Sequence, residues 1–429
     1  MLRGRLLAPA EAAVHAGAAA IVPSPAGNAG VPTHTDVWLL RQVLRREWRF
    51  GGAVLAHPGA VDALDTTYRI ASGPDQAVAL ALEAGVDVVG AGSRVDHLVA
   101  LVQSGAVAPW LVDDAVAAVL SLKFRPGLLD AHPPAHHGAP AARTSPAHVE
   151  RAALTRSTVL LTDPGGVLPL DRARAVEVLP GAVDSADVDA LARALAAVLP
   201  GVAVWPGPAV TTVAPGSPAD AVVVTARPED AVRTAETAVV TGDEIGGLAA
   251  LAATTATVLL CWRPLGDHAG VLADVLAGHA EPGGRLPVAV ASAFPLGHGG
   301  GYTTFDYSRL VISPPVLDGG DVLRVRCSVT NTGSRPGREV VQVYLANPTG
   351  RTVVADGTTL AAFAAVDLEP GQTLPVTVRL PPARLAVWNR TMRHIVEPGT
   401  VDVLVGRSAA DIRLRGTVTV AAHPAYWRR

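Results

Sequence analysis

The amino-acid sequence predicts an α/β plus β fold, in which two α/β segments are followed by an all-β segment. Short apolar runs that suit buried parallel strands alternate with helical patterns over residues 1–130, and the alternation returns over 147–300. A stretch rich in proline, alanine and histidine at 131–146 has the composition of a linker. Over residues 315–422 the apolar period changes to two, with turn signals and no helical pattern, which is typical of a β-sandwich. Residues 301–314 are expected to be a connector.

The first segment is expected to hold three parallel strands with helices between them. The strands are expected at 18–22, 53–56 and 86–90, and the helices at 9–16, 36–48, 73–84, 95–103 and 110–123. Gly85 directly follows the third of these helices, where glycine often ends a helix in a left-handed conformation. Three strands are too few to close an eight-stranded barrel.

The second segment is a longer alternation of the same kind. Strands are expected at 158–161, 176–179, 202–205, 221–225, 257–261 and 286–290, and helices at 188–199, 248–253 and 270–276. Neither the GxGxxG nor the GxxxxGK[ST] pattern is present, so no motif supports a nucleotide site. In the third segment Leu323, Val325, Cys327 and Val329 alternate with polar residues, which predicts a strand with one buried face.

Composition and charge exclude several classes of function. The formal net charge is -3 and no strongly basic tract is present, so binding to nucleic acid or to an anionic membrane surface is not expected. No run of about 18 apolar residues predicts a transmembrane helix. Glu11 and His15 interrupt the apolar N-terminal stretch, which argues against a signal peptide and favours a cytoplasmic location. Cys261 and Cys327 lie far apart without metal-ligand spacing, so no disulfide framework, metal site or cofactor is expected.

One histidine is placed where α/β enzymes carry catalytic side chains. Residues 48–61 read WRFGGAVLAHPGAV: the glycine pair turns the chain, and the apolar run 53–56 suits a buried strand. His57 follows at the carboxyl end of that strand, the edge from which catalytic side chains project in such enzymes. His57 is therefore the best-placed catalytic position in the sequence.

Several stretches, taken together, resemble glycoside hydrolase family 3, the β-glucosidase and β-xylosidase group. LRREWRFGGAVLAHPGAV at 44–61 resembles the family's LRGEWGFDGFVVSDWGAV. LADVLAGHAEPGGRLPV at 272–288 resembles ADVLFGDxNPSGRLPV, and PLGHGGGYTTFDYS at 295–308 resembles PFGYGLSYTTFEYS. VTNTGSRPGREVVQVYL, near the C-terminus, is similar to the family's fibronectin type III-like domain. The resemblance runs over nearly the whole chain, with the motifs in the family's order.

The resemblance implies a partial TIM-like barrel (its last three strands), an α/β sandwich and a C-terminal fibronectin type III-like β-sandwich. It also implies hydrolysis of β-linked glycosides with retention, which uses two carboxyl groups, one of them a nucleophile. The family's nucleophilic aspartate lies in its SDW motif, and this motif falls on Ala56, His57 and Pro58. A histidine at the nucleophile position is not the anionic oxygen that this route needs, so the resemblance implies an impaired enzyme.

The second carboxyl group, the acid/base, has three competing candidates. In the family it is usually a glutamate on a loop of the second domain, and Glu229, Glu236 and Glu244 fall in the corresponding stretch. That stretch lacks the family's DR and LxLP elements, so the choice among the three stays open. Asp62 and Asp65 lie just beyond the strand tip and are alternative carboxylates for the lost nucleophile.

The resemblance also implies partners. β-Linked glucosides or related glycosides are the expected ligands, and the first five barrel strands of the family have no counterpart here. A partner chain or a second copy would then cover the open edge of the three-stranded sheet. The alternatives are an inactive carbohydrate-binding or scaffolding relative, or a fragment that needs an upstream chain. Arg285 and Tyr302, in the best-matched motifs, are expected to be structural, Trp48 to lie in the core, and Trp262 to be a weaker candidate for sugar stacking.

Overall fold

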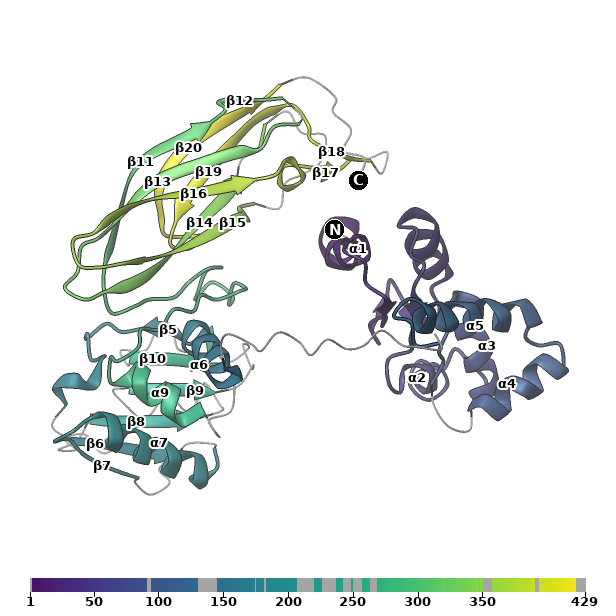
Figure 1. Ribbon diagram of the computed structural model, residues 1–429, viewed down its shortest axis with the longest axis horizontal. Coiled ribbons are helices and arrows are strands. Elements are labelled where there is room, and N and C mark those ends of the chain that lie inside the picture. Colours follow the sequence, from purple (N-terminus) through teal and green to yellow (C-terminus); the bar gives the residue numbers. More distant parts are fainter. Residues whose placement is uncertain are drawn as a thin grey trace. The chain divides into compact units, whose positions relative to one another are not determined.

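The computed structural model describes the chain in separate stretches: 2–90, 94–129, 145–173, 175–180, 183–206, 220–225, 237–241, 248–249, 257–262, 268–318, 320–346, 348–349, 357–389 and 393–421. It divides into two compact units, Met1–Ala141 and Ala142–Arg429 (Figure 1). The division falls inside the stretch 131–146, which the sequence predicts to be a linker.

The sheet of the first unit is parallel, as predicted, but its strands are shorter. Strand β1 (Ala20–Ile21) pairs with β4 (Ala53–Val54), and Leu55 forms a single parallel bridge with Val88. The strand expected at 86–90 is therefore reduced to one bridge. The order β1, β4, Val88 places the strand that leads to His57 in the middle of the sheet.

Asp87 explains why the third strand is so short. Its Oδ2 accepts the backbone N–H of Val54 at 2.6 Å, a group that a longer parallel ladder would pair with a carbonyl oxygen. Arg45 holds the same carboxylate through Nη2 at 2.5 Å, and its Nη1 donates to the carbonyl oxygens of Phe50 and Gly52. One half-buried ion pair therefore fixes both the turn before β4 and the strand beside it.

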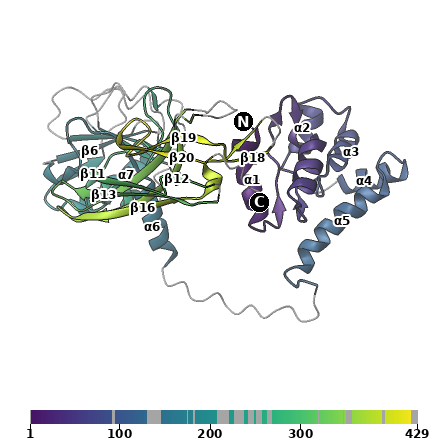
Figure 2. The ribbon, with the colours of Figure 1, turned by 90° about the horizontal axis from the view of Figure 1, so that it is seen from above.

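Helices make up most of the first unit (Figure 2). They are η1 (Leu2–Leu6), α1 (Ala8–His15), η2 (Thr33–Thr35), the π-helix η3 (Trp38–Glu47), α2 (Ala60–Thr66), α3 (Pro74–Ala84), α4 (Arg94–Gln103) and α5 (Pro109–Phe124). The apolar faces of η3, α2, α3, α4 and α5 meet β4 in one core that includes Leu40, Leu64 and Leu82. Gly85 ends α3 with φ of 107°, as the sequence predicts. The short helix α2 and the hairpin of β2 (Gly27–Asn28) and β3 (Val31–Pro32) were not expected.

The second unit begins with a six-stranded sheet in the order β5-β10-β9-β8-β6-β7. Its strands are β5 (Val159–Thr162), β6 (Ala175–Pro180), β7 (Ala203–Pro206), β8 (Asp220–Thr225), β9 (Thr237–Thr241) and β10 (Thr257–Cys261). All neighbours are parallel except β5, which runs antiparallel to β10. Helices α7 (Ser185–Val198) and α9 (Ala269–Leu276) pack their leucines against the sheet, and α6 (Pro146–Ser157) precedes β5 (Figure 1).

Two predictions for this sheet need correction. Strand β9 was not expected, and the strand expected at 286–290 is wrong. The backbone of Leu286 bonds instead to Gly297 and His298, and Val290 bonds to Phe294, so this apolar run folds back on its own loop. The helix expected at 248–253 lies largely outside the described residues.

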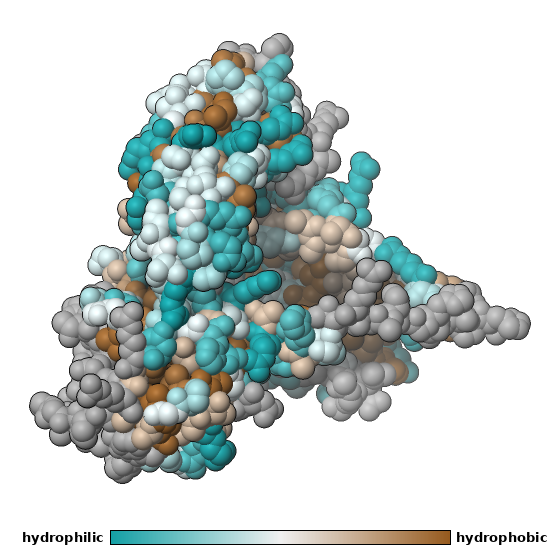
Figure 3. Space-filling model, turned by 60° about the vertical axis from the view of Figure 1, so that its left-hand side comes forward, coloured by the Kyte–Doolittle hydropathy of each residue, from teal (hydrophilic) through white to brown (hydrophobic). Residues whose placement is uncertain are grey.

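The C-terminal part of the second unit is a β-sandwich of a three-stranded sheet, β11-β13-β16, and a five-stranded sheet, β12-β20-β19-β14-β15. The strands are β11 (Phe305–Ser313), β12 (Val316–Leu317), β13 (Leu323–Asn331), β14 (Gly337–Ala346), β15 (Thr359–Leu368), β16 (Thr373–Leu380), β19 (Gly399–Gly406) and β20 (Ile412–Val420), with a small hairpin of β17 (Val387–Trp388) and β18 (His394–Ile395). The alternating residues of β13 point into the core, which confirms the predicted period of two. The face of the sandwich in Figure 3 is mostly hydrophilic, with scattered apolar residues.

The stretch 301–314 is not a connector. Most of it is strand β11, which pairs antiparallel with β13 and buries Phe305 and Tyr307 in the core. The alternation was hidden because the pairing shifts register between Ser308 and Val311, where Arg309 adopts a left-handed φ of 55°. The sandwich therefore begins about ten residues before the predicted boundary at 315.

Candidate functional site

His57 stands at the carboxyl end of the central strand of the first unit, where the sequence places it. The strand ends with the bridge at Leu55, and the N–H of Ala60 then donates to the carbonyl oxygen of His57 at 3.0 Å. Gly59 adopts a left-handed φ of 77° in this turn and precedes helix α2. The tight turn leaves the His57 side chain exposed at the tip of the strand.

A second histidine, His34, holds the backbone of His57 in place. Its Nε2 accepts the backbone N–H of His57 at 3.1 Å, and its side chain is 1% exposed. Burial, and then the nearby charge of His57, lowers the pKa of His34 below the ordinary histidine value. His34 is therefore a neutral acceptor at pH 7. Sequence reasoning missed it, although His34 lies in the loop just before the helix that carries Leu39 and Leu40.

The tautomer of His57 follows from its own contact. Its Nδ1 lies 3.0 Å from the carbonyl oxygen of Pro58, and because a carbonyl oxygen only accepts, Nδ1 carries the hydrogen. Nε2 then presents its lone pair at the exposed tip. This atom can take up a proton, but it does not supply the anionic oxygen of a carboxylate.

The alternative carboxylates do not replace His57 at the strand end. Asp62 lies in the first turn of helix α2 and Asp65 one turn later, so both follow the turn instead of ending the strand. The acid/base candidates Glu229, Glu236 and Glu244 lie outside the described residues. Between Glu236 and Glu244 the structure describes strand β9.

Arg285 and Tyr302 lie at the seam between the six-stranded sheet and the β-sandwich. The hydroxyl of Tyr302 donates to the carbonyl oxygen of Val275 at 2.8 Å, and its backbone N–H donates to Oε1 of Glu281 at 3.0 Å. Oε2 of Glu281 accepts the N–H of Arg338, on strand β14, at 2.8 Å. Burial raises the pKa of Glu281, and the two backbone N–H groups oppose that shift. These contacts make the best-matched motifs a structural joint, as expected.

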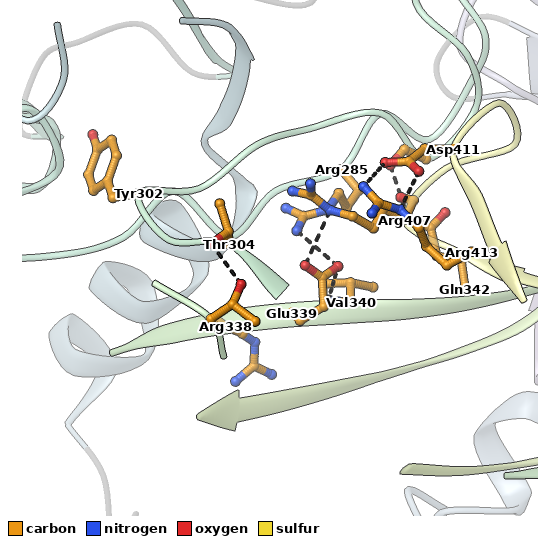
Figure 4. Close-up of polar contacts among 12 residues, drawn as sticks. Arg285, Tyr302, Thr304, Arg338, Glu339, Val340, Gln342, Arg407, Asp411 and Arg413 are labelled. Carbon is orange, nitrogen blue, oxygen red and sulfur yellow. Dashed lines mark hydrogen bonds and ion pairs between the residues drawn. The ribbon is translucent and has the colours of Figure 1, made fainter. Parts of the chain in front are cut away.

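Arg285 adds charged contacts to this structural joint. It lies 3.6 Å from Glu339, a fully buried carboxylate of strand β14, which also lies 3.5 Å from Arg407 (Figure 4). Burial lowers the pKa of Arg285, and the charge of Glu339 opposes that effect. Sequence reasoning gave Arg285 a structural role without identifying Glu339 or Arg407 as its partners.

Two protein-family models match this chain. The model of the glycosyl hydrolase family 3 N-terminal domain matches residues 1–122, and the model of the fibronectin type III-like domain matches residues 339–409. The chain belongs to glycoside hydrolase family 3.

Some relatives of this family 3 chain align over nearly all of its length. A periplasmic β-glucosidase of Salmonella typhimurium is 26% identical, over 94% of this chain and 68% of that protein. A β-xylosidase of Formosa agariphila is 27% identical, over 95% of this chain and 70% of that protein. The crystal structure of a β-glucosidase from Listeria innocua with glucose has the same fold, with a TM-score of 0.81, 23% identity, and coverage of 97% of this chain and 69% of that one.

The two candidate tryptophans of this family 3 chain are held by protein contacts. Trp48 packs against the core of the first unit, as expected. The indole N–H of Trp262 donates to the carbonyl oxygen of Ser157 at 3.0 Å, which fixes the ring at the start of β5. Among the described residues, no group of three or more His, Cys, Asp or Glu side chains could hold a metal ion, and no helix is long and apolar enough to cross a membrane.

Proposed function

We propose that this family 3 chain recognises β-linked glucosides and that its covalent hydrolytic route is impaired. The observation that carries the proposal is His57, exposed at the end of the central strand and held there by His34. The names of the relatives, β-glucosidase and β-xylosidase, support β-linked glycosides as the ligand class.

The chemistry of the strand tip supports impairment. A retaining glycosidase attacks the anomeric carbon with a carboxylate and needs a second carboxyl group about 5–5.5 Å away. An imidazole is neutral or cationic near pH 7, and a cation there would oppose the positive charge of an oxocarbenium-like transition state. We propose that the acid/base is one of Glu229, Glu236 and Glu244, each of which follows the strand expected at 221–225.

Replacing His57 by aspartate tests the proposal. We expect His57→Asp to hydrolyse an aryl β-glucoside above the wild-type rate, because it restores an anionic oxygen at the strand tip. His57→Asn has nearly the same size without the charge, and it should stay at the wild-type rate. If wild type hydrolyses the glucoside measurably and as fast as His57→Asp, impairment at residue 57 is wrong.

Recognition is tested separately from hydrolysis. Isothermal calorimetry of the wild-type chain with β-glucosides and β-xylosides should give a saturable heat of binding. No heat with any of them, at protein concentrations that would reveal millimolar affinity, would count against glycoside recognition.

A second candidate is a chain that is complete only with another polypeptide. Strand β1 is the edge of the described parallel sheet, and helix α5 exposes Val116, Leu120 and Phe124 four residues apart along one face. We propose that a partner chain or a second copy covers this edge. Analytical ultracentrifugation tests the second copy: a concentration-independent monomer mass would exclude it.

A further inference from the structure

Helix α5 presents an apolar face to solvent. It lies at the edge of the first unit (Figure 2) and buries Leu111 and Ala115 in the core of that unit. Away from the core, Val116 is 49% exposed and Leu120 is 40% exposed. The solvent side of a surface helix is ordinarily polar, so this side has the composition of a face that is covered in the assembled protein.

The spacing of the exposed residues is typical of a contact between two helices. Four exposed residues are separated by three, four and three positions and form one stripe along α5: Asp113, Val116, Leu120 and Lys123. The same alternation of three and four lines the seam of a coiled coil. The two central positions of the stripe are apolar, and the two outer positions carry opposite charges.

The two charges at the ends of the stripe are available to another molecule. Neither Asp113 nor Lys123 has an ion-pair partner in the part of the chain that the structure describes. They are ten positions apart on one helix. At 1.5 Å per residue this is about 15 Å, which is too far for them to pair with each other. A partner that fits the stripe therefore carries an apolar centre and the same two charges in reverse order.

We propose that this partner is a second copy of the chain, with the two α5 helices antiparallel about a two-fold axis. The stripe is symmetric, because each charged residue lies three positions outside an apolar one. In the antiparallel pair Val116 faces the partner's Leu120, and Asp113 faces the partner's Lys123. A parallel pair would bring like charges together at both ends, so repulsion selects the antiparallel arrangement.

Phe124 extends the apolar contact on one side of the stripe. It follows Leu120 by four positions and is 62% exposed. By the same symmetry it lies over the partner's Val112, which is half-buried in the single chain. This inference rests on the second candidate function above and adds to it the contact surface, the orientation of the two copies and the charges that set it.

A zero-length carbodiimide cross-link tests the contact in the full chain. The reagent condenses a carboxylate with an amine into an amide, and Lys123 is the only lysine in the sequence. In a mixture of unlabelled and ¹⁵N-labelled chains, we expect a peptide pair that joins Lys123 of one kind to Asp113 of the other. If the chain sediments as a dimer but gives no such mixed pair, this contact is overturned while the second candidate function stands. A monomer at every concentration would exclude the second copy altogether.

Reversal of the two charges gives a test by variants. Asp113→Lys and Lys123→Asp should each raise the dimer Kd by at least about tenfold, because like charges then meet at both ends. An equimolar mixture of the two variants should associate again, since opposite charges face each other once more. Asp114→Lys is the matched control, because Asp114 is exposed on the same helix but lies off the stripe, and its Kd should stay at the wild-type value.

Sedimentation velocity measures the Kd values, and thermal unfolding shows that each variant is folded. A dimer that is unaffected by both reversals would overturn the proposal. So would a mixture of the two variants that associates no more tightly than either variant alone.

Discussion

The backbone N–H of His57 donates a hydrogen bond to Nε2 of the buried His34 at 3.1 Å. The exposed imidazole at the strand tip is therefore positioned by a second imidazole beneath it. This contact depends on His34 being neutral, because a protonated Nε2 would be a donor facing another donor.

We predict that acid weakens the first unit through His34. The pKa of His34 is lowered in the folded state, so the unfolded chain binds the proton first as the pH falls. Stability is then full above the unfolded pKa of about 6.5 and decreases below it, by at most about 1.4 kcal/mol per pH unit. Urea unfolding between about pH 5 and 8, followed by hydrogen exchange of peptides around residues 53–57, measures this slope.

The His34→Gln variant should be less stable at neutral pH but lose less stability in acid, because glutamine keeps an acceptor without titrating. The exposed His279, in the other unit, is the matched control, and His279→Gln should leave the acid slope of the first unit unchanged. An unchanged slope in His34→Gln would show that another group carries the acid sensitivity.

Two glycines around β4 should respond very differently to alanine. A Cβ at Gly59 meets no atom within 4 Å, so Gly59→Ala should cost only the strain of its left-handed φ, about 1–2 kcal/mol. A Cβ at Gly52 would lie 2.1 Å from the carbonyl oxygen of Ala19, beside strand β1. Gly52→Ala should therefore cost more than about 3 kcal/mol by separating β1 from β4. Thermal unfolding of the two variants checks this order, and equal losses would contradict the close approach at Gly52.

Asp87 should be more important for the first unit than its exposed counterparts. Asp87→Ala removes the partner of Arg45 and of the Val54 N–H, and losing hydrogen bonds to a charged group in this half-buried pair should cost about 2–3 kcal/mol. The carboxylate of Glu47, which pairs with Arg3, is 34% exposed against 8% for that of Asp87, and Glu47→Ala should cost no more than about 1 kcal/mol. Urea unfolding measures both, and the first expectation fails if the two losses are similar.

The seam gives a parallel prediction for the second unit. Glu339→Gln leaves two buried guanidinium groups without a counter-charge, which should cost about 3–5 kcal/mol. Asp367→Asn breaks an exposed pair with Arg338 on the same sheet and should cost at most about 1 kcal/mol. Calorimetric unfolding of the second unit compares the two, and a near-neutral Glu339→Gln would show that the charges there are already balanced by other groups.

The sequence predicts best those elements that bury one face and expose the other, because apolar and polar residues then alternate regularly. Leu323 to Val329 alternate cleanly, so strand β13 was evident, and Gly85 marked the end of α3. Strand β11 was missed because the bulge near Arg309 interrupts its alternation. The apolar run 286–290 was misread because its hydrogen bonds go to Phe294, Gly297 and His298, which no local pattern reveals.

The candidate site was also predicted only in part. His57 was evident because a catalytic strand end has a local signature, a short apolar run followed by a turn. His34 was missed because its contact depends on how a separate loop folds beneath that strand. The assignments of Glu229, Glu236 and Glu244 stay predictions, since they fall outside the described residues.

Because the sandwich begins at Phe305, few truncation points leave it intact. A protein cut at residue 315 would lose β11, expose the paired edge of β13, and strip Phe305 and Tyr307 from the core. Even a cut before Phe305 would leave Glu339 without Arg285, which lies upstream of it. The sandwich should therefore be insoluble when expressed alone and well behaved when it carries the six-stranded sheet with it.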